Sequence, residues 1–301
     1  MEDKQVAYHK PVLLTESIDA LSILPTGIYV DVTFGGGGHS AEILKRLDGG
    51  KLYAFDQDPD AVANAPKDNH FVLFQSNFRF LKNHLKLHKA LPVNGILADL
   101  GISSHQIDTP ERGFATRFDA RLDMRMDKTK PLSAYEVVND YEKSKLADVI
   151  FQYGELRNAR QLATQIVERR KQGPIETTGQ LIETVKKNIP AQYADKFSAM
   201  LFQAIRIEVN EELTVLKEFL SQTVETLAPG GRLVVLSYHS LEDRLVKNFI
   251  KSGNFEGKIE KDFFGNPNVP FKVLKKVTAT EAEVKENPRA RSAIMRIAEK
   301  L

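Results

Sequence analysis

The stretch YVDVTFGGGGHS, residues Tyr29–Ser40, is a short apolar run that ends in four consecutive glycines. Glycine tolerates positive φ and leaves no side chain between the main chain and a bound group. The apolar run predicts a buried parallel strand, and residues 40–46 (SAEILKR) predict the start of a helix. A strand, a glycine turn and a helix N-terminus together indicate a nucleotide-type α/β site.

The residues beside the glycines restrict the kind of nucleotide. A triphosphate-binding loop needs Lys-Ser or Lys-Thr after its last glycine, whereas this chain has His39 and Ser40. A dinucleotide pattern survives in one register, from Gly36 through Gly38 to Ala41. The loop alone therefore leaves two cofactors open, nicotinamide dinucleotide and S-adenosylmethionine.

An acidic residue follows the second apolar run. Residues 51–55 are apolar enough for a buried strand, and Asp56 comes next. It stands about 20 residues after the glycines, where a carboxylate accepts hydrogen bonds from ribose hydroxyls. Both cofactors contain an adenosine ribose, so Asp56 supports the site without choosing between them. Asp58, just before Pro59, is predicted to cap the next helix.

Further apolar runs define the fold class. Residues 71–74 and 95–100 predict two more strands, with intervals long enough for crossover helices. Residues 227–237 predict a fifth strand, and residues 292–298 alternate as an edge or antiparallel strand. We expect a doubly wound, Rossmann-like α/β sheet with its ligand at the carboxyl ends of the strands.

The interval between Leu100 and Arg232 is far longer than one crossover, which needs about a dozen residues. Its apolar residues recur with helical period, and Thr177 with Gln180 predicts a capping box. One predicted helix face consists of Leu146, Val149, Ile150 and Tyr153. The sequence thus predicts an all-helical insertion domain at residues 109–210, inside a cofactor domain of residues 1–108 and 211–301.

Composition excludes several classes of protein. The 301 residues are 42% hydrophobic, enough for two cores, and include no cysteine for disulfides or thiolate metal sites. No His, Asp or Glu set has metal-ligand spacing, so we expect no metal. The first five residues are polar, and no apolar stretch reaches transmembrane length, which predicts a cytoplasmic protein without a membrane partner.

Local charge is more informative than the net charge of +2. One basic group lies near the carboxyl end, and it comprises Lys272, Lys275, Lys276, Lys285, Arg289 and Arg291. A second follows the fourth strand, and it comprises Arg112, Arg117, Arg121 and Arg125. Such clusters either pair with an RNA backbone or form intramolecular ion pairs on a solvated surface, and charge alone favours the second.

Several motifs follow one another along the chain. They are HKPVLL from His9, DVTFGGGGH from Asp31, DQDP from Asp56, DLGISS from Asp99, ERGF from Glu111, LDMRMD from Leu122, FQAIRIEVN from Phe202, HSLEDR from His239 and NPRARS from Asn287. In this order, over nearly the whole chain, they resemble the bacterial 16S ribosomal RNA cytosine-N4 methyltransferases, the RsmH or MraW family.

The resemblance implies a class I S-adenosylmethionine-dependent methyltransferase sheet with a helical insertion. It implies methylation of the N4 amine of a cytidine in the decoding region of 16S rRNA, within the small ribosomal subunit. The implied cofactor contacts are Gly37, Gly38, His39, Asp56, Phe78, Asp99 and Gln106. Phe78 suits an adenine face, Asp99 the methionine ammonium, and Gln106 a polar edge of the cofactor.

The chemistry adds a demand of its own. Cytosine N4 is a weak nucleophile, so the enzyme must hold acceptors against its N–H groups and align it with the methyl donor. Asp99 is the first candidate, although the following Leu-Gly-Ile departs from the Pro-Pro-aromatic sequence common in DNA amino methyltransferases. Asp99 serves the cofactor, the amine or both. His239 is a second candidate, with a structural histidine as the alternative.

The target base must leave its stack to reach such a site. We expect the helical insertion and the basic carboxyl-terminal segment to cradle the RNA, with Arg289 and Arg291 as contacts. Two other classes remain open. The glycine register keeps an NAD-dependent oxidoreductase possible, and a non-catalytic binding protein for immature ribosomal subunits would share the same motifs.

Overall fold

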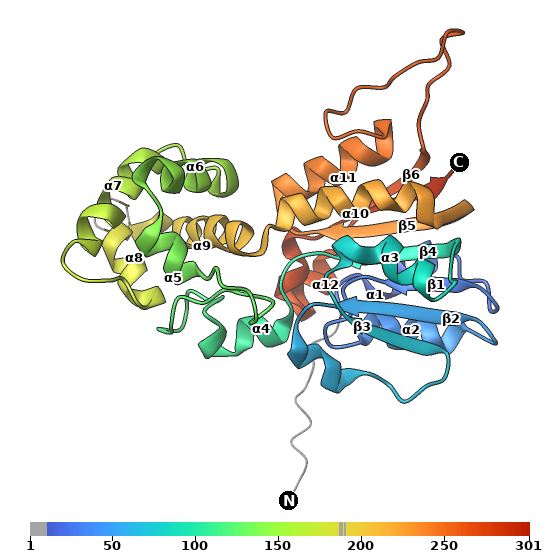
Figure 1. The fold of residues 1–301 in the computed structure, drawn as a ribbon, viewed down its shortest axis with the longest axis horizontal. Coiled ribbons are helices and arrows are strands. Elements are labelled where there is room, and N and C mark those ends of the chain that lie inside the picture. The colour runs from blue at the N-terminus through green and yellow to red at the C-terminus, as the bar shows by residue number, and fades with distance from the viewer. Residues whose placement is uncertain (1–10, 187–188, 190) are drawn as a thin grey trace, which may run out of the picture. The chain divides into compact units, whose positions relative to one another are not determined.

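The computed structural model describes residues 11–186, 189 and 191–301. His9 and Lys10 of the first motif, and the polar residues 1–5, lie outside these ranges. The chain divides into two compact units. The sheet unit contains the described residues up to Gly101 and then Leu213–Leu301, whereas the helical unit is Ile102–Glu212 (Figure 1).

The sheet unit is built on a seven-stranded sheet of order β3-β2-β1-β4-β5-β7-β6. The strands are β1 Ile28–Asp31, β2 Lys51–Asp56, β3 Phe71–Gln75, β4 Val93–Asp99, β5 Leu227–Ser237, β6 Phe271–Thr278 and β7 Ile294–Lys300. Strands β1 to β5 are parallel, and β7 runs antiparallel to both β5 and β6. The predicted Rossmann-like sheet, with its helical insertion between β4 and β5, is confirmed.

The sheet ends differently from the sequence prediction. The last apolar run does form an antiparallel strand, β7, but β7 lies between β5 and β6 rather than at the edge. The strand at this edge of the sheet is β6, whose residues were predicted only as part of a basic cluster. Lys272, Lys275 and Lys276 are exposed on it. Lysines on an edge strand discourage pairing with other chains, which gives this part of the basic cluster a structural reason.

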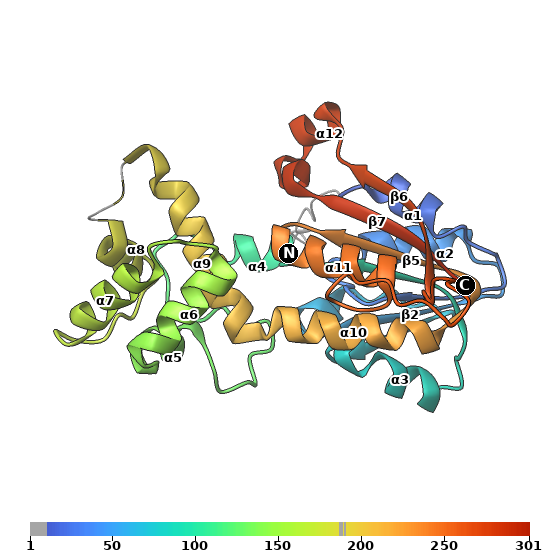
Figure 2. The ribbon, with the colours of Figure 1, turned by 90° about the horizontal axis from the view of Figure 1, so that it is seen from above.

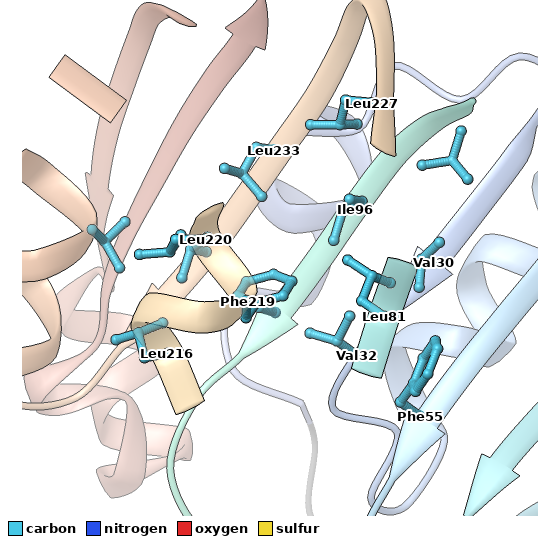
Figure 3. Packing of buried hydrophobic residues seen from close by; sticks show 14 of the residues in the cluster. Val30, Val32, Phe55, Leu81, Ile96, Leu216, Phe219, Leu220, Leu227 and Leu233 are labelled. Carbon is cyan, nitrogen blue, oxygen red and sulfur yellow. The ribbon is translucent and has the colours of Figure 1, made fainter. Parts of the chain in front are cut away.

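Helices cover both faces of the sheet, and the buried residues of each strand alternate between them. One face packs against α3 Leu81–Leu87, α10 Glu212–Thr226 and α11 Ser240–Ser252. The other packs against α1 Leu14–Ala20 and α2 Gly38–Arg46. Figure 2 shows α3 and α10 on one side and α1 and α2 on the other. Figure 3 shows Val30, Ile96 and Leu233 meeting Leu81 and Phe219.

Shorter helices complete the sheet unit. They are the 3₁₀ turns η1 Pro59–Asn64, η2 Phe78–Phe80 and η5 Pro288–Ser292, together with α12 Glu281–Glu286. The turns η1 and η2 directly follow β2 and β3, at the carboxyl edge of the sheet. They therefore place their side chains at the edge where an α/β sheet binds ligands.

The helical unit has its own apolar core. Its elements are α4 Ser104–Asp108, η3 Pro110–Arg112, α5 Ala134–Asp140, α6 Lys143–Gly154, α7 Ala159–Arg170, α8 Thr178–Lys186, η4 Ala191–Tyr193 and α9 Ala194–Asn210. Leu146, Val149 and Ile150 are buried, as the helical period predicts. Within the described ranges, no helix is long and apolar enough to cross a membrane.

The predicted capping box at the start of α8 forms in a shifted version. Thr177 Oγ1 accepts from the Gln180 N–H, as expected. The Gln180 side-chain oxygen, however, accepts from the N–H of Glu176 at 2.8 Å rather than from that of Thr177. The helix start is therefore capped by two bonds that span one more residue than the standard motif.

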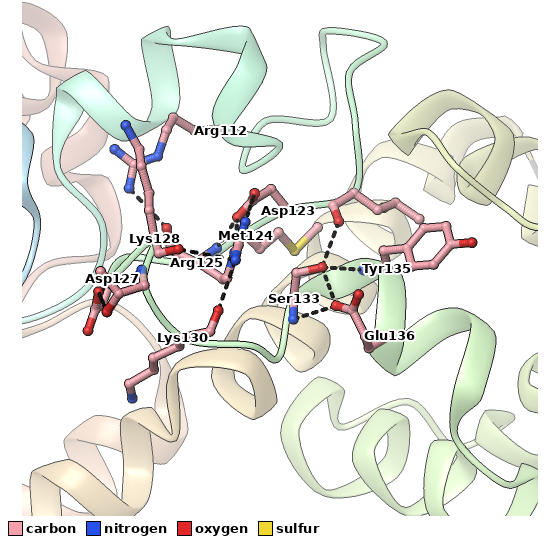
Figure 4. Close-up of polar contacts among 12 residues, drawn as sticks. Arg112, Asp123, Met124, Arg125, Asp127, Lys128, Lys130, Ser133, Tyr135 and Glu136 are labelled. Atoms are coloured by element: carbon pink, nitrogen blue, oxygen red, sulfur yellow. Dashed lines mark hydrogen bonds and ion pairs between the residues drawn. The ribbon is translucent and has the colours of Figure 1, made fainter.

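A polar network holds the connection that leads into α5 (Figure 4). Arg125 donates hydrogen bonds from Nε and Nη2 to the Asp123 carboxylate, at 2.9 and 2.7 Å, and it also donates to the carbonyl of Lys130. The buried guanidinium of Arg112 donates from Nη2 to the carbonyls of Arg125 and Met126 at 2.9 and 3.2 Å. These arginines replace the backbone pairing that an irregular segment lacks.

Candidate functional site

Three neighbouring strands of the sheet end in aspartate. Asp56 closes β2, Asp31 closes β1 and Asp99 closes β4. The three strands are adjacent and parallel, so their carboxyl ends meet at one edge. Three carboxylates at the edge where α/β sheets bind ligands make this edge electronegative, which suits a ligand that carries positive charge.

Asp31 connects the glycine turn to the sheet through hydrogen bonds of its side chain. Its side chain is buried, and its Oδ2 accepts a 2.7 Å hydrogen bond from Ser40 Oγ in α2. Its Oδ1 accepts from the N–H of Thr33 at 3.1 Å. The Thr33 hydroxyl in turn accepts a 2.7 Å bond from the N–H of Asp99. Asp31 and Thr33 thus fix the glycine turn against the ends of β1 and β4.

Packing against other residues of the protein, and not only space for a ligand, requires glycine in the glycine turn. Gly37 has φ +77°, and a Cβ there would lie 3.0 Å from the Phe34 ring. A Cβ on Gly38 would lie 2.2 Å from Cγ of Pro11. Protein atoms already occupy the space beside both glycines. The expectation that a ligand lies against the turn therefore depends on its main-chain groups and not on these Cβ positions.

Asp56 braces the same turn from the next strand. Its Oδ2 accepts a 2.7 Å bond from the N–H of Gly35, and its Oδ1 accepts a 2.8 Å bond from the N–H of Asp58. Burial, together with the nearby carboxylates of Asp58 and Asp31, raises the Asp56 pKa to about 6, although these two hydrogen bonds lower it. Asp58 caps η1 through a bond from the Asp60 N–H, as the sequence predicts.

Asp99 lies between a tyrosine and a histidine. The Tyr238 hydroxyl donates a 2.6 Å hydrogen bond to Asp99 Oδ1. On the other side, Asp99 Oδ2 lies 3.8 Å from Nδ1 of His39. His39 is buried, and its Nε2 lies 3.2 Å from the carbonyl oxygen of Val12. The structure therefore brings together two of the predicted site residues, Asp99 and His39.

The pKa of Asp99 reflects this position. Burial raises it, while the charge of His39 and the hydrogen bond from Tyr238 lower it in part. Burial and the negative charge of Asp99 raise the pKa of Tyr238 well above its usual value, because both oppose loss of the phenolic proton. The phenol is thus a fixed donor to Asp99 across the physiological pH range.

His239 has a structural task in the sheet unit. It is the N-cap of α11, and its Nδ1 faces the N–H of Glu242 at 3.5 Å. Its Nε2 lies 3.3 Å from Oε1 of Glu242, whose Oε2 accepts from the N–H of Tyr238 at 2.9 Å. This is the structural alternative named for His239, and its catalytic role stays a prediction.

The remaining predicted cofactor residues have local roles of their own. Phe78 in η2 is partly buried and meets Phe219 of α10 edge to face, with ring centroids 5.3 Å apart. Gln106 is buried in the helical unit, where its Oε1 accepts from the N–H of Ser103 at 3.0 Å in a capping box. Neither contact tests binding of a cofactor, so the cofactor roles of Phe78 and Gln106 stay predictions.

The predicted RNA contacts differ in exposure. Arg291 is exposed in η5, whereas Arg289 beside it is only partly exposed. In the helical unit, Arg112 and Arg125 are committed to the network described above, and Arg117 pairs with Asp108. Arg121 is exposed. Arg117 and Arg125 therefore form intramolecular ion pairs, as charge alone favoured, whereas the buried Arg112 donates to backbone carbonyls instead.

Three residues at this edge, Asp31, Thr33 and Tyr238, were not predicted from the sequence. Asp31 and Thr33 stand inside the quoted motif, but their partners Ser40 and Asp99 are revealed only by the folded turn. Tyr238 directly follows β5 and precedes His239, which was the residue predicted for the site. A signal was available: in a doubly wound sheet, polar residues just after adjacent strands converge.

Comparison with known proteins agrees with this architecture. A model of the MraW methylase family matches residues 6–301. The ribosomal RNA small subunit methyltransferase H of Flavobacterium johnsoniae is 60% identical over 296 residues, covering 98% of each chain. The proteins of that name from Christiangramia forsetii and Bacteroides fragilis are 56% and 54% identical, covering 98% and 100% of each chain. This chain therefore belongs to the MraW methylase family.

Proposed function

We propose that this methylase transfers a methyl group from S-adenosylmethionine to the N4 amine of a cytidine in 16S rRNA of the small ribosomal subunit. The observation that carries the proposal is the aspartate edge, Asp56, Asp31 and Asp99, beside the glycine turn of a family methylase. The names of the relatives support ribosomal RNA as the substrate. A cytoplasmic location accords with that substrate.

The two cofactors that the glycine loop allows, nicotinamide dinucleotide and S-adenosylmethionine, differ in charge. A dinucleotide would bring a doubly negative pyrophosphate to an edge where burial and neighbouring carboxylates already raise the pKa of Asp56 to about 6. S-adenosylmethionine brings a sulfonium and an ammonium, which the same carboxylates attract. The electrostatics of the edge therefore favour S-adenosylmethionine over a nicotinamide cofactor.

The residues at the edge fit the parts of that cofactor. Asp56 keeps acceptor capacity beyond its bonds from Gly35 and Asp58, because an ionised carboxylate has about four acceptor sites, so it is proposed to hold the ribose hydroxyls. Gly37 is the N-cap of α2 and Gly38 its first residue, and both are proposed to approach the cofactor through their main chain, with His39 beside them. Phe78 and Gln106 are proposed to contact the adenine and a polar edge.

Asp99 is proposed to serve both the cofactor and the substrate. Tyr238 uses one acceptor site on its Oδ1, and the remaining sites of the carboxylate suffice for the methionine ammonium and one N–H of cytosine. An acceptor on that N–H returns electron density to N4, which is otherwise delocalised into the ring. When bound, S-adenosylmethionine supplies an activated methyl group, so the chain's contribution is chiefly alignment and charge.

RNA recognition is proposed to involve the helical unit and the carboxyl-terminal basic segment. The helical unit is far larger than a crossover between β4 and β5 requires, and it has a core of its own. Arg291 is the exposed member of the predicted arginine pair and is the better placed for phosphate contact. The target cytosine must leave its stack to reach the edge.

One assay tests the proposal. The protein is incubated with methyl-labelled S-adenosylmethionine and with either free 16S rRNA or assembled small subunits, and the RNA is then digested and analysed by mass spectrometry. We expect label on N4 of a single cytidine. Label on another nucleotide would overturn the N4 assignment, and absence of label from both substrates would favour a non-catalytic binding protein. Calorimetry with NAD, which we expect to show no binding, tests the oxidoreductase alternative.

A further inference from the structure

The segment between α11 and β6 ends in a small, well-braced hairpin at residues 260–268, which projects from the sheet unit (Figure 1). Lys261 and Pro267 form an antiparallel bridge, and the N–H of Asn268 donates to the carbonyl of Glu260 at 2.8 Å. At the tip, Asp262 Oδ1 accepts from the N–H groups of Phe264 and Asn266, both at 2.9 Å. The tip is thus held in one shape by its own hydrogen bonds.

This shape presents two aromatic rings to solvent. Phe263 is 98% exposed and Phe264 85%, which makes them the most exposed large apolar side chains among the described residues. Their rings stand edge to face with centroids 5.6 Å apart, so each keeps an open face. Neither ring contributes to a core of the described chain. Exposed apolar groups on an ordered loop tip indicate a contact surface.

The charges around the rings indicate what that surface contacts. Lys261 is exposed on the hairpin and Lys258 is exposed just before it, and the chain continues into β6 with three more exposed lysines, Lys272, Lys275 and Lys276. The acidic residues of the same stretch are Glu256, Glu260 and Asp262. Asp262 is directed into the turn, where its hydrogen bonds from Asn266 lower its pKa. Residues 256–276 therefore carry five lysines against three acidic residues, a net charge of +2, with the excess supplied by the lysines of β6.

Flat rings among lysines match the chemistry of unpaired nucleotides. Bases stack on aromatic side chains, and lysines neutralise the adjoining phosphates. A groove on a protein partner would bury the rings without needing the lysines that precede and follow them in the chain. We propose that the hairpin of residues 260–268 binds single-stranded segments of the substrate RNA by stacking bases on Phe263 and Phe264. The proposal rests on the proposed function and adds a recognition element to it.

The central test compares two double variants. Phe263→Ala with Phe264→Ala removes the apolar bulk, and Phe263→Leu with Phe264→Leu keeps the bulk but removes the flat face. Both rings are exposed, so neither variant should change thermal unfolding or S-adenosylmethionine affinity. We expect both to weaken binding to 16S rRNA about 10-fold, because stacking is lost in each. Normal binding by the leucine variant would overturn stacking and indicate a generic apolar contact.

A direct probe is available because the chain contains no tryptophan. Phe263→Trp creates a single indole at the tip, and its fluorescence should be quenched when single-stranded oligoribonucleotide is added. Unchanged fluorescence at saturating RNA would overturn the proposal. This readout separates the two hypotheses: quenching without methyl transfer would contradict the proposed function alone. Methyl transfer and RNA binding that do not respond to the alanine and leucine variants would contradict the hairpin proposal alone.

Discussion

The hydroxyl of Tyr238 donates a 2.6 Å hydrogen bond to Oδ1 of Asp99, joining the residue after β5 to the last residue of β4. The two strands are neighbours in the sheet, but the residues lie 139 positions apart in the chain. The bond therefore couples the two halves of the discontinuous sheet unit at its carboxyl edge. It also orients the carboxylate that we propose receives the cofactor and the amine.

Replacing this phenol should weaken cofactor binding without disturbing the fold. Tyr238→Phe removes a hydrogen bond to a charged acceptor, and about 10-fold lower affinity for S-adenosylmethionine is expected at neutral pH. Because the bond lowers the Asp99 pKa, its loss should also move the pH dependence of binding to higher pH. Calorimetry between about pH 6 and pH 9 measures both the affinity and its pH dependence.

Asp99→Asn is the matched variant. It keeps an acceptor for the Tyr238 hydroxyl but cannot ionise, so binding should be lost while thermal stability at pH 8 is retained or raised, since burial disfavours the charged form. A variant that binds cofactor normally would show that the Asp99 charge is not used.

The pKa of Asp56, about 6, predicts a pH dependence of cofactor affinity. Below that value the carboxyl is neutral and attracts a cationic ligand less, so affinity should rise with pH and level off above about 7. Asp56→Asn should bind more weakly at pH 7 and lose the dependence between pH 5 and 7, which are about one unit on either side of that pKa. A titration that retains the wild-type slope in this variant would assign the dependence to another group.

Glycine substitutions can separate backbone strain from steric contact. Gly49→Ala tests strain alone, because Gly49 has φ +82° and an added Cβ meets nothing within 4 Å. It should cost about 1 kcal/mol of unfolding free energy. Gly38→Ala tests contact alone, since its Cβ would lie 2.2 Å from Pro11 Cγ, and it should cost about 2 kcal/mol or more. Denaturant unfolding measures both, and equal stability of Gly38→Ala and wild type would refute the contact.

The helical unit offers a comparison of two arginines. Arg112→Met removes a buried guanidinium that donates to the carbonyls of Arg125 and Met126, and it should destabilise the protein by about 3 kcal/mol. Arg121→Met, at an exposed position, should change stability by less than about 0.5 kcal/mol. Thermal unfolding of the two variants side by side makes the measurement, and similar melting temperatures would contradict the assigned role of Arg112.

Arg291 is expected to act through its charge. Arg291→Ala should weaken RNA binding and reduce the slope of log affinity against log salt by about one. Arg291→Lys keeps the charge and should keep the slope. Filter binding at a series of salt concentrations distinguishes the variants, and an unaltered slope in the alanine variant would remove Arg291 from the RNA surface.

Sequence pattern predicted the parts of the fold in which local hydrophobicity reflects burial. Strands β1 to β5 are apolar runs because helices cover both faces of the sheet. Strand β6 was missed because it is an edge strand of which only Phe271 is fully buried, so its lysines read as a charge cluster. Long-range partners are likewise invisible in sequence, and for this reason Tyr238 was overlooked and the particular partners of Arg112 and Arg125 were not foreseen.

The position of β7 sets the order in which this protein can be completed. Its residues are the last strand of the chain, yet they fill the gap between β5 and β6. During synthesis, β5 therefore has an open edge until residues 294–300 emerge, and the sheet cannot close strand by strand in chain order. Removing the last eight or so residues would expose two strand edges at once, so premature termination should yield an aggregating product rather than a shortened enzyme.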